Sequence, residues 1–503
     1  MESIDAVQKA RGGDVAASEL IAALRDSDAL VRRKAALALG ELGRAACAAV
    51  AALIDALTDT DAAVRRQAAA AIGQIGPESG DTTPAIIAAL HDADAAVRRE
   101  AAACLAILRA VDPEVVLALV HALQDADVEV LLAAAETLAS IAPQHPATLP
   151  ALARLISHPI PLVRRRAAIA IGELESKDTA AVEAIARAIT DSDDYVRIEA
   201  VDAIGRSDLE PAAAVSVLVG AMDDSNVLVR QRAAASLAEF GSAAAAAVPA
   251  LVRTLRDRSG DVSASAAYAL GRIAPDPPTV LPALIDALRD GDAAAPDYVV
   301  AAIRQLHAEQ AAVPLLGEML RDADVLVRRQ SAAALGRIGP RAEAAVPQLV
   351  AALRDEQDYI RRQAAFALGQ IGPPARSAVA ALATSLGDRD DGVRLEAIGS
   401  LALIGPDAKS AVPDLLQWAN NSALRQDVLA ALRRIDPDRH SHAWLIAIVR
   451  QASSLQPVFW PTLAGWKPAR RPARRHPTIF TASNSPPNTS RLGQPSHDSS
   501  TLA

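Results

Sequence analysis

The feature that most constrains this chain is a short motif that returns every 33 residues along the sequence. An apolar residue, usually valine and usually followed by arginine, marks each copy. The markers with this spacing are Val31, Val64, Val97, Val130, Val163, Val196, Val229 and Val262, and the series continues at Val299, Val327, Ile360, Val393 and Leu424. A fixed period of this length is typical of proteins built from stacked structural repeats, in which each unit packs only against its neighbours. The sequence therefore predicts thirteen stacked units.

Each unit has the pattern of two helices joined by a short turn. Within residues 48–76, Val50 and Leu53 follow a helical period, Asp61 ends a polar turn, and a second apolar helical face begins at Val64. Aspartate is a preferred N-cap, because its carboxylate accepts the free N–H groups of the first helical turn. Apolar residues make up 51% of the chain, much of it alanine, which favours closely spaced helices. No run alternates with a period of two, so we expect no strands.

Three positions of the unit resemble HEAT repeats, especially the short, alanine-rich type of phycobilin-lyase-like proteins. They are a proline in the first helix, an aspartate in the turn and the Val-Arg pair that opens the second helix. The prolines stand at Pro84, Pro150, Pro249, Pro314 and Pro347. Ankyrin repeats have a similar period, but their T-P-L-H motif is missing here. The resemblance covers about residues 13–437 and implies an all-α solenoid of two-helix repeats.

The resemblance also implies a structural ladder of alternating aspartate and arginine side chains between neighbouring repeats. The aspartate lies five residues before the marker and the arginine directly follows it. Arginine suits this position because its planar fork can serve two carboxylates. We assign the ladder to Asp26, Arg32, Asp59, Arg65, Asp92, Arg98, Asp191, Arg197, Asp224, Arg230, Asp322, Arg328, Asp355, Arg361, Asp388 and Arg394.

The chain divides into a solenoid over residues 1–455 and a tail over residues 456–503. Residues 441–455 can form an amphipathic helix that caps the last repeat, since terminal repeats otherwise expose apolar surface. A soft joint is predicted within residues 257–310, where Ser263 and Val300 replace the ladder arginine. The tail is basic and rich in proline and serine, a composition that predicts disorder.

The second helices of HEAT solenoids line the concave surface, which makes this surface the predicted binding site. Positions two, six and ten after the marker project away from the core at 100° per residue. The predicted partner-binding residues on this surface are Arg33, Arg66, Arg99, Arg165, Tyr268, Arg329 and Phe366. A row of arginines with a few exposed apolar side chains fits an acidic or partly apolar segment of another protein. A plain solvated helix face is the alternative interpretation of the same positions.

Charge and composition bound the other functions. The formal net charge is −9 and aromatic residues are 2%, which disfavours nucleic acid as the partner. No uncharged run of 18 apolar residues and no secretory signal is found, so no membrane partner is predicted and we expect a cytoplasmic protein. The sequence favours a non-catalytic scaffold or adaptor without a cofactor.

Two enzyme classes related to the repeat remain as alternatives. Phycobilin lyases attach a bilin to a client protein, yet no catalytic residue can be matched. Deoxyhypusine hydroxylase carries iron on His-Glu pairs, and none of the nine histidines here is followed by glutamate. Cys104 replaces an alanine of other repeats and is interpreted as a core residue, while Cys47 precedes a first helix.

Overall fold

A computed structural model describes residues 13–76, 82–174, 178–206, 210–273, 276–289 and 295–437 of the 503-residue chain. Within these ranges the regular secondary structure is entirely helical. They all belong to one compact unit, which extends over Met1–Ser453. The predicted capping helix at 441–455 and the predicted tail at 456–503 lie outside the described residues.

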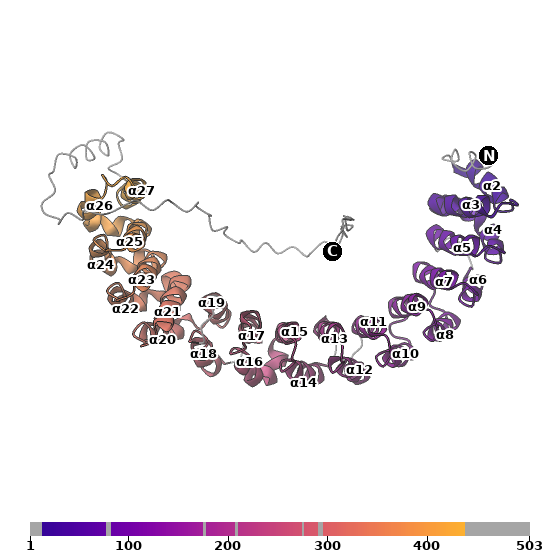
Figure 1. Cartoon of the computed structure of the whole chain (residues 1–503), viewed down its shortest axis with the longest axis horizontal. Coiled ribbons are helices and arrows are strands. Elements are labelled where there is room, and N and C mark those ends of the chain that lie inside the picture. Colours follow the sequence, from indigo (N-terminus) through magenta and orange to yellow (C-terminus); the bar gives the residue numbers. More distant parts are fainter. Residues whose placement is uncertain are drawn as a thin grey trace, which may run out of the picture. The chain divides into compact units, whose positions relative to one another are not determined.

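Thirteen helix pairs follow one another along the described part of the chain (Figure 1). The first helices of the pairs are α2 (Gly13–Ala23), α4 (Val50–Ala56), α6 (Thr83–Ala89), α8 (Pro113–Ala122), α10 (Thr148–Leu155), α12 (Thr179–Ile189), α14 (Pro211–Ala221), α16 (Val248–Thr254), α18 (Pro277–Asp286), α20 (Glu309–Met319), α22 (Val346–Ala352), α24 (Val379–Ser385) and α26 (Val412–Gln417). Five of them are preceded by 3-10 segments, namely η1 (Gly43–Ala49), η3 (Gly241–Ala247), η4 (Gly339–Ala345), η5 (Pro373–Ala378) and η6 (Gly405–Ala411).

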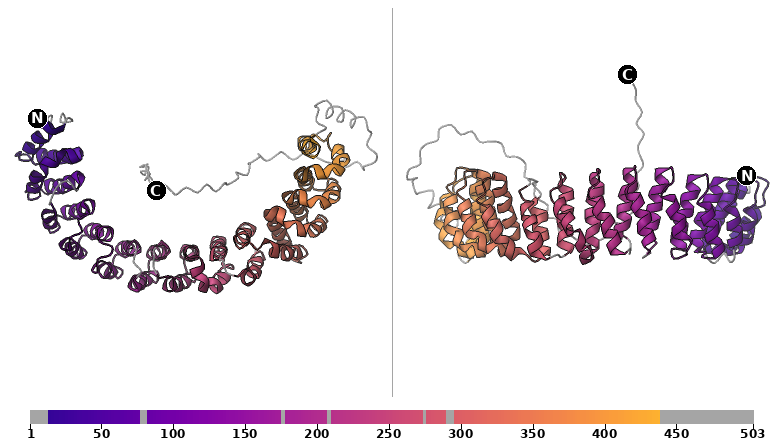
Figure 2. Two further views of the ribbon diagram at one scale, coloured as in Figure 1. Left: turned by 180° about the vertical axis from the view of Figure 1, so that it is seen from behind. Right: turned by 90° about the horizontal axis from the view of Figure 1, so that it is seen from below.

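The second helices form a separate layer. They are α3 (Ala29–Leu42), α5 (Ala62–Ile75), α7 (Ala95–Leu108), α9 (Val128–Ile141), α11 (Pro161–Gly172), α13 (Asp194–Arg206), α15 (Val227–Glu239), α17 (Gly260–Ile273), α19 (Ala295–Gln305), α21 (Val325–Ile338), α23 (Asp358–Ile371), α25 (Asp391–Ile404) and α27 (Arg425–Ile435). Within this unit the second helices lie on the inner side of the row and the first helices on the outer side (Figures 1 and 2). The predicted all-α solenoid is confirmed.

The boundaries of the second helices follow from local chemistry. The Oδ1 atom of Asp61 accepts the backbone N–H groups of Ala63 at 2.9 Å and Val64 at 3.1 Å, which caps α5 at its N-terminus. At the other end Gly76 has a φ of 85°, a conformation that glycine adopts without steric cost. These caps orient α5 so that its marker and alanine face enter the core.

The core is a continuous strip between the two layers. In the second pair, Leu53 of α4 and Val64, Ala68 and Ile72 of α5 have no exposed surface, as the helical pattern predicted. Alanine at the contact lets the helices approach closely, so the strip is thin and each layer touches only its neighbours.

The run Ala29–Ala56 has the length and apolar composition of a membrane span. In the structure it is divided into α3, η1 and α4, and Gly43 breaks the backbone with a φ of 56°. Leu39 and Leu53 within this run are fully buried in the solenoid core. Packing between repeats therefore buries part of the apolar surface of this run.

Candidate binding face and the ladder beside it

A repeated pair of arginine and aspartate joins each repeat to the next. In one pair, the Nε and Nη2 atoms of Arg65 each donate a hydrogen bond of 2.7 Å to the carboxylate of Asp92. Nη1 of the same arginine donates to the backbone carbonyl of Asp59 in its own turn at 2.8 Å, and Asp92 also accepts the N–H of Asp94. One guanidinium thus fastens two consecutive interhelical turns.

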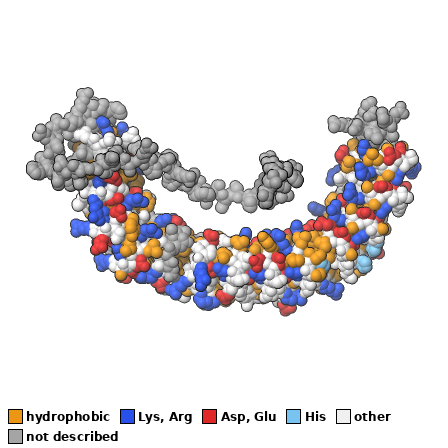
Figure 3. Space-filling view, viewed as in Figure 1, with side chains coloured by type: hydrophobic (Ala, Val, Ile, Leu, Met, Phe, Trp, Pro, Cys, Tyr) orange, Lys and Arg blue, Asp and Glu red, His pale blue; other side chains and the backbone are white. Residues whose placement is uncertain are grey.

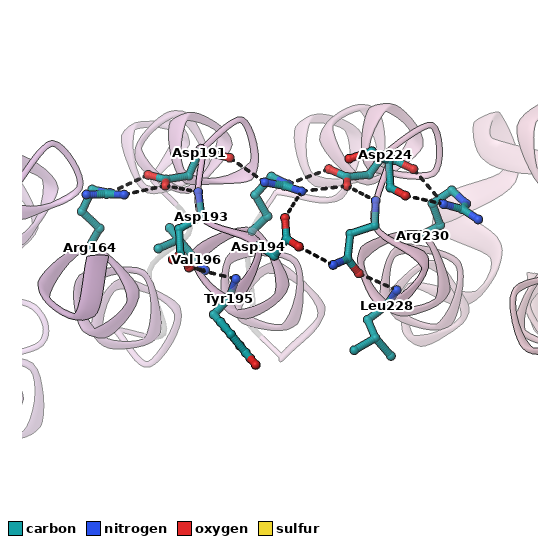
Figure 4. Close-up of polar contacts among 12 residues, drawn as sticks. Arg164, Asp191, Asp193, Asp194, Tyr195, Val196, Asp224, Leu228 and Arg230 are labelled. Atoms are coloured by element: carbon teal, nitrogen blue, oxygen red, sulfur yellow. Dashed lines mark hydrogen bonds and ion pairs between the residues drawn. The ribbon is translucent and has the colours of Figure 1, made fainter. Parts of the chain in front are cut away.

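The same geometry occurs eight times in the described residues, and Figure 4 shows its central part. The pairs are Arg32–Asp59, Arg65–Asp92, Arg98–Asp125, Arg164–Asp191, Arg197–Asp224, Arg230–Asp257, Arg328–Asp355 and Arg361–Asp388. Hydrogen bonds from the arginines hold the pKa of Asp59, Asp92, Asp125, Asp191 and Asp257 below the usual range for aspartate. The carboxylates are therefore stabilised in their charged form.

The ladder is interrupted where both members of a pair are replaced. Between α9 and α11, the arginine position holds Leu131 and the aspartate position holds His158. Leu131 is buried, so its side chain fills space at the junction instead of making an ion pair. This junction has no ladder bond and is held by apolar packing together with the exposed Arg166–Glu136 pair.

A second interruption covers the layers from α17 to α21. Ser263 stands where the arginine is expected, and its Oγ donates to the carbonyl of Asp257 at 3.3 Å. Val300 replaces the next arginine and is buried. The soft joint predicted for residues 257–310 falls in this region and stays a prediction, since residues 274–275 and 290–294 lie outside the description.

Three residues assigned to the ladder have other partners. Asp26 has no arginine on its carboxylate, which instead accepts the N–H of Asp28 at 2.8 Å. Asp322 pairs with Arg289, because the preceding layer offers Val300 in place of arginine. Arg394 has Ala419 at the next aspartate position, so its guanidinium lies 5.1 Å from the ring centre of Trp418. These three residues therefore depart from the pattern of the eight pairs, although the backbone carbonyls of Asp26 and Asp322 still accept hydrogen bonds from Arg32 and Arg328.

The inner face of the second helices contains the predicted partner-binding residues. Among them Arg33, Arg99, Tyr268 and Phe366 are exposed, and the three others, Arg66, Arg165 and Arg329, are half-buried. All seven occupy second helices, which form the inner layer (Figure 1). Their role in binding stays a prediction. Figure 3 shows apolar side chains breaking up the charged surface along the inner edge.

The inner face also includes a position that the sequence analysis missed, the residue directly before the marker. Tyr195 stands there on α13 with 65% of its surface exposed, and the guanidinium of Arg165 lies 5.8 Å from its ring centre. Leu162 and Leu228 occupy the same position in the flanking layers and are exposed. In Figure 4 the side chains of Tyr195 and Leu228 point away from the ladder. A large apolar residue recurring before the marker was the available signal.

Arginines on the central part of this face are matched by carboxylates. Arg165 donates to Glu199 through Nη2 at 2.6 Å and Nε at 3.1 Å. Around this pair lie three looser ones of 3.4 to 4.0 Å, namely Arg166–Glu136, Arg232–Asp202 and Arg272–Glu239. Burial raises the pKa of Asp202 above its usual range, which Arg232 and Arg206 partly oppose.

At the N-terminal end the corresponding arginines have no such partner. Within the described residues, Arg33, Arg66 and Arg99 form no hydrogen bond and no ion pair, and the same is true of Arg329. Among the described residues, these guanidinium groups thus have no carboxylate within bonding distance.

The aromatic side chains are concentrated on the inner face. All four tyrosines lie on second helices, with Tyr195, Tyr298 and Tyr359 directly before the marker and Tyr268 six residues after it. Three of them are more than 40% exposed, and Phe366 is 36% exposed. The other tyrosine, phenylalanine and tryptophan side chains in the described ranges are at least half-buried.

The remaining candidate sites are two cysteines and one groove on the outer layer. Burial raises the pKa of Cys104 to about 12, so it is a core thiol as predicted, whereas Cys47 is partly exposed. Between α18 and α20 an apolar groove of about 600 Å³ is lined by Leu281, His307 and Leu315 together with several prolines. Over the described ranges, no three His, Cys, Asp or Glu side chains are grouped as metal ligands would be.

The stacked helix pairs, the ladder and the exposed inner face define a helical-repeat solenoid. A family model described as HEAT repeats matches residues 17–83, 83–159, 148–232, 215–303, 281–365 and 346–433. The chain belongs to the HEAT-repeat family, and the predicted resemblance is confirmed at this level. Its phycobilin-lyase-like subtype remains a prediction.

Solved structures with the same fold include karyopherin Kap121p. Kap121p alone matches with a TM-score of 0.56 and 16% identity, over 89% of this chain and 58% of that one. Kap121p bound to Pho4p gives a TM-score of 0.55 and 15% identity, with the same coverage. Kap121p bound to the extreme C-terminus of the phosphatase Cdc14p gives 0.56 and 16%, over 84% and 54%. This chain thus spans little more than half the length of these relatives. A comparison with curated protein sequences gave no match.

Proposed function

We propose that this protein is a non-catalytic scaffold that binds an extended segment of another protein along the inner face of its solenoid. The observation that carries the proposal is the location of the exposed aromatic residues. Tyrosine and arginine are enriched at protein interfaces, because they combine a large contact area with hydrogen-bonding groups. Only 2% of the chain is aromatic, yet Tyr195, Tyr268, Tyr359 and Phe366 are all exposed on one face.

The solenoid also supports this function by its construction. Ladder pairs fix the register between layers, so equivalent side chains on successive second helices form rows. Because these rows exist before a partner binds, binding costs less conformational entropy. Among the similar structures, Kap121p is bound to Pho4p in one and to the extreme C-terminus of Cdc14p in another. A solenoid of the same fold therefore accommodates protein segments, which supports the same use here.

Site-specific photo-crosslinking tests the location of the partner. A photoreactive phenylalanine analogue placed at Tyr268 or Phe366 probes the inner face. The same analogue at Leu315 probes the outer groove, and at Leu117 it probes the exposed surface of α8. Leu315 and Leu117 serve as matched controls, because both are exposed and neither lies on a second helix.

We expect one protein to crosslink from Tyr268 and Phe366 and from neither control position. The combined substitution Tyr195→Ala, Tyr359→Ala and Phe366→Ala should weaken capture of that protein at least about tenfold, as loss of interface anchors does. Crosslinks from Leu315 or Leu117 alone would overturn the inner face as the binding site. Release of a small-molecule product from the captured protein would overturn the non-catalytic assignment.

A further inference from the structure

The inner face carries an excess of positive charge in its first three layers. At the face positions of α3, α5 and α7, which are the residue before the marker and those two, three, six and ten after it, four cations meet two carboxylates. The cations are Arg33, Lys34, Arg66 and Arg99, and the carboxylates are Glu41 and Glu100. We call Arg33, Arg66 and Arg99 the arginine row, since each stands at the same position of its layer.

The arginine row is held in register by the residues that precede its members. Arg32 and Arg65 make bidentate bonds of 2.7 Å to Asp59 and Asp92 in the following layers. The residue that follows each of these arginines is a member of the row. The ladder therefore sets the distance between the Cα atoms of successive members of the row. A row fixed in this way loses little conformational freedom when it binds a ligand.

Small side chains lie beside the arginine row, and larger apolar side chains lie at its two ends. Ala70 and Ala103 occupy the sixth position of α5 and α7, where α17 carries Tyr268 and α23 carries Phe366. A peptide backbone can therefore lie close to these helices. Leu37 at the start of the row and Ile107 at its end are 42% and 53% exposed.

The spacing of the row selects the register of its ligand. Adjacent packed helices lie roughly 8–10 Å apart, and an extended chain advances about 3.3 Å per residue. One layer thus corresponds to three residues of an extended peptide. The planar guanidinium group binds a carboxylate through two parallel hydrogen bonds, which makes it sensitive to this placement.

We infer that the arginine row binds an extended acidic segment of a partner protein with a carboxylate at every third residue. This inference rests on the proposed function and specifies its partner at the N-terminal layers. Charge complementarity identifies the occupant: the row presents three unpaired guanidinium groups, one per layer. Glu41 and Glu100 border the row and disfavour ligands with carboxylates at every position.

Two labelled peptides of the same composition test the register. One has aspartate at positions 1, 4 and 7 of a flexible nonapeptide, about three residues apart to match the layer spacing, and the other has its three aspartates contiguous. Fluorescence anisotropy with the full chain measures both affinities in low and moderate salt. We expect the spaced peptide to bind at least about fivefold more tightly than the contiguous one.

Matched variants test the residues. The triple substitution Arg33→Ala, Arg66→Ala and Arg99→Ala should reduce binding of the spaced peptide at least about tenfold. The control triple Arg321→Ala, Arg354→Ala and Arg376→Ala removes the same charge from exposed positions outside the second helices and should leave binding within about twofold. The single Arg66→Lys variant keeps the charge and loses the fork, so it should weaken the spaced peptide more than the contiguous one.

Equal affinity for the two peptides, or equal losses from the two triple variants, would overturn the inference. So would tighter binding of a phosphorylated peptide or a single-stranded oligonucleotide through the same three arginines. These outcomes are separable from failure of the proposed function, which the crosslinks from Tyr268 and Phe366 report independently. If the triple variant does not fold, the Arg66→Lys variant tests whether the guanidinium group binds the spaced peptide. This variant should fold, because Arg66 lies on the surface of α5 and the substitution keeps its charge.

Discussion

The N-terminal stretch from α3 to α9 and the central stretch from α11 to α17 share one ladder and differ on their inner faces. Each stretch contains three ladder pairs of the same geometry. In the N-terminal stretch Arg33, Arg66 and Arg99 have no partner among the described residues, whereas in the central stretch Arg165 is held by Glu199 beside Tyr195. Neighbouring residues of one motif thus differ in their contacts, and the face varies while the ladder stays constant.

The largest expected effect is acid destabilisation, because all ladder pairs respond together. The pKa values of Asp59, Asp92 and Asp191 are lowered in the folded chain. As the pH falls below about 4, the unfolded chain therefore binds more protons than the folded chain does. The ladder's contribution is present above the ordinary aspartate pKa and is lost as the pH falls through the folded-state pKa. Hydrogen exchange at pH 3 and pH 6 should show loosening within both stretches. The junction between α9 and α11, which has no pair, should change least.

Removing a single ladder arginine should have the next largest effect. Arg65→Ala leaves the Asp92 carboxylate partly buried without its guanidinium, which should cost about 1–3 kcal/mol, between the values for exposed and buried pairs. Arg197→Ala should cost more, since Arg197 also bonds to Asp194. Urea unfolding measures both. Arg66→Ala is the control, and a loss equal to that of Arg65→Ala would contradict the separate roles of the two residues.

Removing the central carboxylates should make the centre resemble the N-terminal stretch. Glu199→Gln and Asp202→Asn release Arg165 and Arg232 from their present partners. In a background without the arginine row, these changes should raise affinity for the spaced acidic peptide by about fivefold. Anisotropy measures the gain. An unchanged affinity would show that Tyr195, and not the carboxylates, keeps acidic segments from the centre.

The smallest effect should come from restoring the missing ladder pair between α9 and α11. Leu131→Arg alone should destabilise the chain, because Leu131 is buried and the new charge would lack a partner. Adding His158→Asp supplies that partner. A double-mutant cycle in urea should give a favourable coupling of about 0.5–1 kcal/mol. A coupling of zero would mean that the layers at this junction are offset from those elsewhere.

The fold could be predicted from the sequence because each level of the pattern indicates the same structure. The markers, the aspartate N-caps such as Asp61 and the glycines that end the second helices together specify two helices per unit. Units of this kind can bury their apolar faces in few arrangements other than a stack. The aspartate and arginine positions predicted which residue types meet across layers. They did not predict the exceptions at Asp322 and Arg394, which depend on what the adjacent layer offers.

The candidate site was less predictable, because it depends on contacts between residues far apart in sequence. Arg165 meets Glu199, 34 residues further on, because α11 packs beside α13 in the neighbouring layer. The predicted face comprised positions two, six and ten after the marker, and Tyr195 stands before the marker of its layer. The residue before the marker lies 100° behind it on the helix and shares the same side as the sixth and tenth positions.

The gaps in the ladder have a mechanical consequence. Each arginine–aspartate pair connects adjacent layers only, so a pulling force along the row passes through every junction in series. The junction between α9 and α11 and the layers from α17 to α21 lack these ladder pairs, and ion pairs that do cross them, such as Arg166–Glu136 and Arg289–Asp322, are more exposed than the ladder. We therefore expect tension to separate the molecule first at these places, leaving the ladder-paired blocks on either side of each gap intact.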